Sequence, residues 1–136
     1  MKLQEKMGMT DEMYPLPTRD LAHRRRDLAP EISATFDAFS QRVFADGALS
    51  SKTKQIIAVA VAHVTQCPYC IRGHTKGALR AGASEAEVME AIWVAAEMRA
   101  GGSYAHSLLA IDEMDRARAA TEHQPPAVAS GEHTCR

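Results

Sequence analysis

The chain has 136 residues, 46% of them hydrophobic and 24% charged, and carries a formal net charge of −1. This is the composition of an ordinary globular protein, and the length suits one domain with a core of its own. The balanced charge excludes the basic surface typical of nucleic-acid binding, and the longest apolar run, residues 56–62, is far too short to span a bilayer. We therefore expect neither nucleic acid nor a membrane as a partner.

The two ends of the chain lack periodicity. Residues 1–17 contain two prolines and are predicted to form an irregular arm, and residues 121–136 are predicted to form a flexible polar tail. The helical domain is expected over residues 18–120. No apolar signal segment begins the chain, and the three cysteines, at 67, 70 and 135, are not a secreted disulfide framework, so we expect a cytoplasmic protein.

The first two helices are predicted from their start signals. Thr18 or Asp20 can begin a helix that runs to about Leu28, and Pro30 can open the next. In the second helix, apolar residues recur at spacings that fit one helical face, and Asp46-Gly47 ends it. These residues are Ile32, Phe36, Phe39, Val43 and Phe44.

A third helix is expected from a cap at Ser50 or Ser51 to Thr65. Because residues 56–62 are apolar on all sides, this helix is predicted to be central in the bundle. A buried strand is the rival interpretation of so short a run, but the serine start, the alanines and the length favour a helix.

The remaining helices follow from caps and glycines. Cys67 is expected at the N-cap of a fourth helix, with Pro68 at its first position and a stop at Gly82. Residues 84–87, Ser-Glu-Ala-Glu, form a capping box for a fifth, whose inner stripe is Val88, Ile92, Ala95 and Ala96. Gly101-Gly102 is predicted to break or kink the chain before a sixth helix from residue 103 to about residue 119. The fold class is therefore all-α, a single domain of about six helices.

The tetrad Cys67-Pro68-Tyr69-Cys70, with His74 four residues after its second cysteine, is the strongest chemical signal. Two thiols at this spacing can close a small disulfide ring. At a helix start both sulfurs lie near free N–H groups and the positive end of the helix dipole, which favours thiolate. His74 would lie one turn further along and could carry a proton to or from a sulfur.

Two other interpretations of the cysteines stay open. They could be small buried hydrophobes beside an incidental histidine, although single cysteines fit that interpretation better than a CxxC pair. They could also bind zinc with His74 and a fourth ligand from His63 or His106, but no second CxxC is present. For both of those histidines a packed, structural role is favoured. The tetrad also occurs in glutaredoxins, yet here it lies at mid-chain with no downstream proline strand.

The arrangement resembles the carboxymuconolactone decarboxylase superfamily, in its alkylhydroperoxidase D (AhpD)-like branch. The resemblance covers roughly residues 30–115 and rests on the order and spacing of short segments. These are Leu49-Ser50-x-Lys52, the CPYC tetrad with His74, Gly82-Ala83-Ser84, and Gly101-Gly102-Ser103-Tyr104-Ala105-His106. It implies an AhpD-like helical bundle that assembles as a homo-oligomer, a trimer or a hexamer.

The resemblance also implies roles for the site residues. Cys70 would attack a peroxide, Cys67 would resolve the product as a disulfide, and His74 would relay protons. The relay of this branch uses a glutamate twelve residues before the first cysteine, where this chain has Gln55. An amide cannot pass a proton as a carboxylate does, but it can orient a water or His74. Glu97 is the candidate carboxylate to replace that glutamate. The alternative, given equal weight, is that Glu97 is an exposed acid with no role in the site.

We therefore predict an oxidoreductase, a thiol-dependent peroxidase or disulfide reductase, that acts on a peroxide or disulfide substrate. A dithiol reductant, for which the resemblance implies a lipoyl group or another dithiol carrier, would regenerate the thiols. No organic cofactor or metal is required. The alternatives are a non-redox lyase of the decarboxylase type and a metal- or redox-sensing binding protein.

Overall fold

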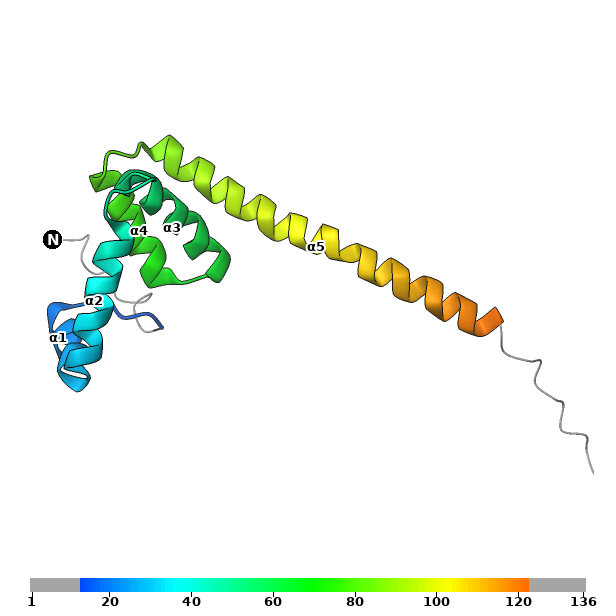
Figure 1. Ribbon diagram of the computed structural model, residues 1–136, viewed down its shortest axis with the longest axis horizontal. Coiled ribbons are helices and arrows are strands. Elements are labelled where there is room, and N and C mark those ends of the chain that lie inside the picture. Colours follow the sequence, from blue (N-terminus) through cyan, green and yellow to red (C-terminus); the bar gives the residue numbers. More distant parts are fainter. Residues whose placement is uncertain (1–12, 123–136) are drawn as a thin grey trace, which may run out of the picture. The chain divides into compact units, whose positions relative to one another are not determined.

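The computed structural model describes residues 13–122, which contain helices and no strand. The helices of this part of the chain are α1 (Arg19–Leu28), α2 (Pro30–Phe44), α3 (Ser51–Thr65), α4 (Pro68–Arg80) and α5 (Glu85–Glu122) (Figure 1). The all-α prediction is confirmed. Most of the predicted arm and nearly all of the predicted tail, with Cys135, lie outside the described residues. Over the range described, no helix is both long and apolar enough to cross a membrane.

Local capping explains where the first and third helices begin. Thr18 Oγ1 accepts a hydrogen bond from the backbone N–H of Leu21 at 3.3 Å, and Ser50 Oγ accepts one from Thr53 at 3.1 Å. Each bond satisfies an N–H that has no partner within its own helix. Both caps are residues that the sequence singled out.

The connection between α4 and α5 is also set by local signals. Gly82 has a positive φ of 93°, and the next N–H, of Ala83, reaches back to the carbonyl of Ala78 at 2.9 Å. Only glycine adopts this backbone conformation without steric cost. The capping box is then formed in both directions, from Ser84 N–H to Glu87 Oε2 at 2.7 Å and from Glu87 N–H to Ser84 Oγ at 3.1 Å.

A salt bridge joins the start of α5 to α3. Lys52 Nζ lies 2.7 Å from Glu87 Oε1. The hydrogen bond from Lys52, with that from the Ser84 backbone, lowers the pKa of Glu87 below its ordinary value. The acidic group that caps α5 therefore also fixes the beginning of α3 against it.

The core is small and consists of alanine and valine side chains. Helices α3 and α4 lie side by side (Figure 1), and Val59 and Ala78 between them are fully buried, with Ala83 and Val88 completing the cluster. Small side chains let two helices approach closely. The central position predicted for α3 holds for the face with Val59 but not for the face with Val61, which is 52% exposed.

Two expectations about α5 are wrong. The helix continues through Gly101 and Gly102, so the predicted break and the separate sixth helix are absent from the described chain. Glycine in a helix interior costs only about 1 kcal/mol relative to alanine, and the flanking residues are good helix formers. The inner stripe is wrong at Ala96, which is exposed, while Ala91 is buried instead. Val88 and Ala95 are buried as predicted, and Ile92 packs against the core cluster.

The described residues belong to two compact units, which divide between Met98 and Arg99. In the first unit, the apolar face predicted for α2 is largely exposed, with Ile32 at 76% and Phe36 at 64%. In the second unit, the α5 residues are exposed along most of their length, including Tyr104 at 83% and Leu108 at 70%. Within residues 13–122, each unit thus carries large apolar side chains that are exposed.

Candidate active site at the start of α4

A two-residue connection, Gln66 and Cys67, joins α3 to α4. Gln66 ends α3 in the left-handed conformation, at φ 55°, and the N–H of Cys67 donates to the carbonyl of Ala62 at 3.1 Å. This hydrogen bond closes the end of α3. The chain therefore reverses at once, and the CxxC segment starts α4 directly beside the end of α3.

Cys67 caps α4 as predicted. Its sulfur accepts a hydrogen bond from the backbone N–H of Cys70 at 3.2 Å, and Pro68 occupies the first helical position. The two cysteines are joined by a disulfide, with their Cα atoms 5.2 Å apart. The structure thus shows the oxidised state of the pair. In the reduced state, the same N–H and the helix dipole would favour a thiolate at the cap.

His74 is held by Gln55. The imidazole Nδ1 and the Gln55 amide oxygen Oε1 lie 2.9 Å apart. Because an amide oxygen only accepts hydrogen bonds, Nδ1 carries the proton in this arrangement and Nε2 is left free to accept one. The ring of Phe44 stacks on the face of the His74 imidazole, with the ring centroids 5.0 Å apart and the ring planes at 30° to one another. The histidine is therefore fixed in both tautomer and orientation.

Gly77 makes room for this hydrogen bond. A Cβ at position 77 would lie 2.6 Å from Gln55 Oε1 and 2.8 Å from Gln55 Cδ, which is closer than real Cβ contacts. In its present position the Gln55 amide occupies the space that a side chain at residue 77 would need. Gly73, one turn earlier on α4, has no atom within 4 Å of the equivalent position.

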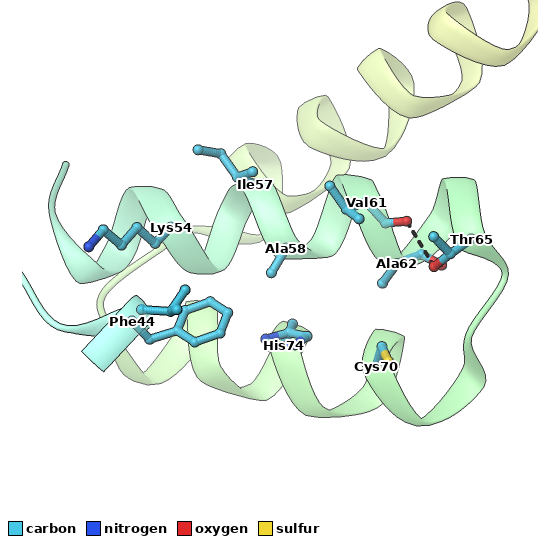
Figure 2. A pocket seen from close by; sticks show the side chains of 10 residues that line it. Phe44, Lys54, Ile57, Ala58, Val61, Ala62, Thr65, Cys70 and His74 are labelled. Atoms are coloured by element: carbon cyan, nitrogen blue, oxygen red, sulfur yellow. Dashed lines mark hydrogen bonds between the residues drawn. The ribbon is translucent and has the colours of Figure 1, made fainter. Parts of the chain in front are cut away.

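A cavity of about 430 Å³ opens beside Cys70 and His74, between α2, α3 and α4. Figure 2 shows both side chains projecting from α4 towards α3. Most of the lining is apolar, and Cys67 is not part of it. Lys54, the one lysine on the wall, donates to the carbonyl of Ala45 at 2.6 Å. The lining residues are Val43, Phe44, Lys54, Ile57, Ala58, Val61, Ala62, Thr65, Cys70 and His74.

The other candidates lie apart from this cavity wall. Glu97 is exposed on α5 and does not line the cavity, so its role as a substitute carboxylate stays a prediction. His63 Nδ1 lies 2.8 Å from the carbonyl oxygen of Val59, a local bond within α3 that fits a packed, structural histidine. His106 is exposed in the second unit. Over residues 13–122, no group of three or more His, Cys, Asp or Glu side chains is placed to hold a metal ion.

Sequence reasoning missed three contributors to the site. Gly77 could have been noticed, because an isolated glycine inside a helical pattern usually has a packing reason. Phe44 was assigned only to the apolar face of α2, and its stacking on His74 depends on how α2 packs. Gln66 gave no signal, since glutamine has no preference for the left-handed conformation.

Comparisons with known proteins identify the family. Residues 30–113 match the carboxymuconolactone decarboxylase family, and the chain belongs to that family. It is 56% identical over 112 residues to a Paracoccus denitrificans protein described as uncharacterized protein 4 in cox locus, a match that covers 80% of this chain and all of that protein.

Solved structures agree with this assignment. A protein from Methanobacterium thermoautotrophicum is 35% identical, with a TM-score of 0.58 over 61% of this chain and 93% of that one. A carboxymuconolactone decarboxylase family protein from Legionella pneumophila, crystallised in its apo form, is 34% identical, with a TM-score of 0.56 over 58% of this chain and 70% of that one. The resemblance seen in the sequence is thereby confirmed at the level of the family.

Proposed function

We propose that this protein is a thiol-dependent peroxidase or disulfide reductase in which Cys70 attacks and Cys67 resolves. The observation that carries the proposal is the position of Cys70. This sulfur shares the wall of an apolar cavity with His74 and is bonded to Cys67, which lies at the N-cap and off the wall. Membership of an enzyme family supports the proposal at a coarser level.

The reaction runs in three steps. The Cys70 thiolate attacks one peroxide oxygen, the O–O bond breaks, and the departing oxygen takes a proton by way of His74. The Cys70 sulfenic acid then reacts with the Cys67 thiol, which forms the disulfide; the thiol proton and the departing hydroxyl leave as water. A dithiol finally reduces the disulfide, and two thiols return as the dithiol closes to its own disulfide.

Gln55 acts in this scheme by orienting His74. Its amide holds the Nδ1 proton, so that Nε2 is the nitrogen available to take a proton from a thiol or a water. A carboxylate in the same place would also stabilise a charged imidazolium, which an amide does less well. We therefore infer a working but slower proton relay than a glutamate would support.

The test of this proposal is a pair of serine variants. Cys70→Ser should abolish peroxide consumption driven by dithiothreitol, because the sulfur on the cavity wall beside His74 is gone. In the absence of reductant, Cys67→Ser should still consume one equivalent of peroxide per chain and stop at the sulfenic acid, which dimedone traps on Cys70. Full turnover by Cys70→Ser would contradict the proposal, and dimedone labelling of Cys67 in the Cys70→Ser protein would reverse the assigned roles.

The alternative functions have less support. A lyase acting on an anionic lactone would need cations in the cavity, where Lys54 is the one lysine or arginine on the wall, and it would give the cysteine pair no role. A decarboxylation assay on the double cysteine variant separates this alternative from the redox proposal, since a lyase would keep its activity. Metal analysis of protein purified without chelator tests the sensing alternative.

We further propose that the protein assembles as a homo-oligomer, a trimer or a hexamer. The support is the amount of uncovered apolar surface, on α2 in the first unit and along α5 in the second. Exposed apolar side chains in such numbers mark interaction surfaces. Light scattering on a sizing column gives the mass, and a monomer would contradict this proposal without affecting the redox one.

A further inference from the structure

The end of α2 is held on α3 by a lysine that has no part in the reaction steps above. Lys54 is half-buried, and its Nζ donates to the carbonyl of Ala45 at 2.6 Å. Ala45 is the C-cap of α2, so this carbonyl lies at the negative end of that helix, where a cation is favourable. In the connection that follows, Asp46 Oδ1 accepts a hydrogen bond from the backbone N–H of Ser51 at 2.6 Å. These two hydrogen bonds fix the end of α2 against the start of α3.

Apolar burial contributes little to holding α2 on α3. The predicted inner face of α2 is exposed within the described residues, at Ile32, Phe36 and Phe39. Burial of apolar surface is the main force that packs a helix against its neighbours, and α2 buries little of this face. The polar contacts after its last residue therefore have a large share in deciding where the end of α2 lies.

The end of α2 carries the ring that packs on the proposed proton carrier. Phe44 is the last residue of α2 and directly precedes Ala45. Its ring stacks on the His74 imidazole, with the centroids 5.0 Å apart (Figure 2). Gln55, which follows Lys54 on α3, lies 2.9 Å from Nδ1 of the same imidazole. Two neighbouring residues of α3 therefore act on this histidine, Gln55 by a direct hydrogen bond and Lys54 by way of the end of α2.

We propose that Lys54 is a positioning residue for the proton relay, which acts on His74 through Phe44. The proposal rests on the redox function above and adds a residue whose hydrogen bond is to the backbone of α2. While that hydrogen bond is intact, the phenyl ring lies against the imidazole and limits its rotation. When it is removed, the end of α2 is free to move from α3, and the imidazole can turn its Nδ1 away from Gln55.

The first experiment measures kcat/KM for hydrogen peroxide with dithiothreitol as the reductant. Hydrogen peroxide is too small to need the apolar wall, so a loss of activity reports on the relay and not on substrate packing. Lys54→Met keeps the apolar stem but removes the donor, and it should lower kcat/KM by roughly threefold to tenfold. Phe44→Leu should lower it by a similar factor. Lys54→Arg keeps a donor and Phe44→Tyr keeps a flat ring, so each should recover most of the activity.

Lys52→Met is the matched control. It removes a lysine two residues earlier on α3, whose partner is Glu87 at the start of α5. It should lower the midpoint of urea unfolding about as much as Lys54→Met does, but leave kcat/KM unchanged. The double variant of Lys54→Met and Phe44→Leu should be as active as Phe44→Leu alone, because both changes remove the same stacking contact. An equal loss of activity in Lys52→Met, or a double variant in which the two losses multiply, would overturn the proposal.

An NMR measurement tests the proposal without relying on activity. The chemical shifts of the two ring nitrogens distinguish the tautomers of a histidine, and His74→Gln identifies which signals belong to His74. The unmodified protein should show the tautomer protonated at Nδ1, and Lys54→Met and Phe44→Leu should each show a mixture of both tautomers. An unchanged tautomer in Lys54→Met would overturn the role of Lys54. Absence of peroxide turnover in the unmodified protein would instead contradict the redox function, so the two failures can be told apart.

Discussion

Alanine at position 77 should separate the orientation of His74 from the stability of the fold. The added Cβ would lie 2.6 Å from Gln55 Oε1, and ordinary contact begins at 3.4 Å, so the oxygen must move by about 0.8 Å. A move of this size stretches the present 2.9 Å hydrogen bond to at most about 3.7 Å, beyond the range in which a hydrogen bond holds. His74 would then lose the partner that fixes its tautomer.

The expected effects on stability and activity differ. Loss of one hydrogen bond costs about 1 kcal/mol, and replacing glycine by alanine inside a helix contributes about 1 kcal/mol, so the free energy of unfolding should change little. Activity should fall by about 10- to 100-fold, because a misplaced proton carrier acts poorly. Steady-state peroxide consumption with dithiothreitol, together with urea unfolding, measures both quantities.

Gly73→Ala is the matched control. It makes the same substitution one turn earlier on α4, where the added Cβ meets no atom within 4 Å. This variant should be as active as the unmodified protein and more stable by up to about 1 kcal/mol. If Gly77→Ala were as active as Gly73→Ala, the inference that Gln55 orients His74 would be refuted.

Three further predictions concern the helix caps and the cavity. Ser50→Ala should lower the free energy of unfolding by about 1 kcal/mol in urea titrations, because the N–H of Thr53 loses its acceptor. The lowered pKa of Glu87 means that its pairing adds stability above the ordinary value of 4.5, and that this stability is lost as the pH falls through the lower, folded-state pKa. Glu87→Gln should thus be less stable than the unmodified protein at neutral pH, and the difference should shrink as the pH falls below 4.5; a difference that stayed constant on acidification would exclude this cause. Ile57→Lys, on the apolar cavity wall, should raise the KM for cumene hydroperoxide by roughly threefold to tenfold and leave that for hydrogen peroxide unchanged. Equal changes for the two peroxides would show that the wall does not contact the organic group.

The features predicted correctly from the sequence are those that depend on near neighbours. Caps at Thr18, Ser50 and Cys67 each satisfy an N–H three residues along the chain, so the residue type is enough to predict them. The capping box of α5 and the glycine end of α4 have the same local origin. The cysteines also fall within one helical turn, and their pairing follows from that spacing.

Features that depend on packing were beyond the sequence. Gln55 and His74 are 19 residues apart, and only the side-by-side arrangement of α3 and α4 brings them together. The continuation of α5 through its glycine pair was also missed. A glycine pair lowers the stability of a helix, but it does not determine whether the helix ends there. The surroundings of Glu97 could not be predicted for a similar reason, since spacing along one helix does not indicate which residues line a cavity formed by others.

The hydrogen bond from the Cys70 N–H to the Cys67 sulfur, at the start of α4, should change with the redox state of the cysteine pair. The N–H of Cys70 donates to a sulfur that changes from a neutral disulfide atom to a thiolate when the pair is reduced. A thiolate is the stronger acceptor, so this one amide should shift in an NMR spectrum and exchange more slowly with solvent after reduction. Reduction of the cysteine pair should therefore strengthen this hydrogen bond in the first turn of α4, and oxidation should weaken it.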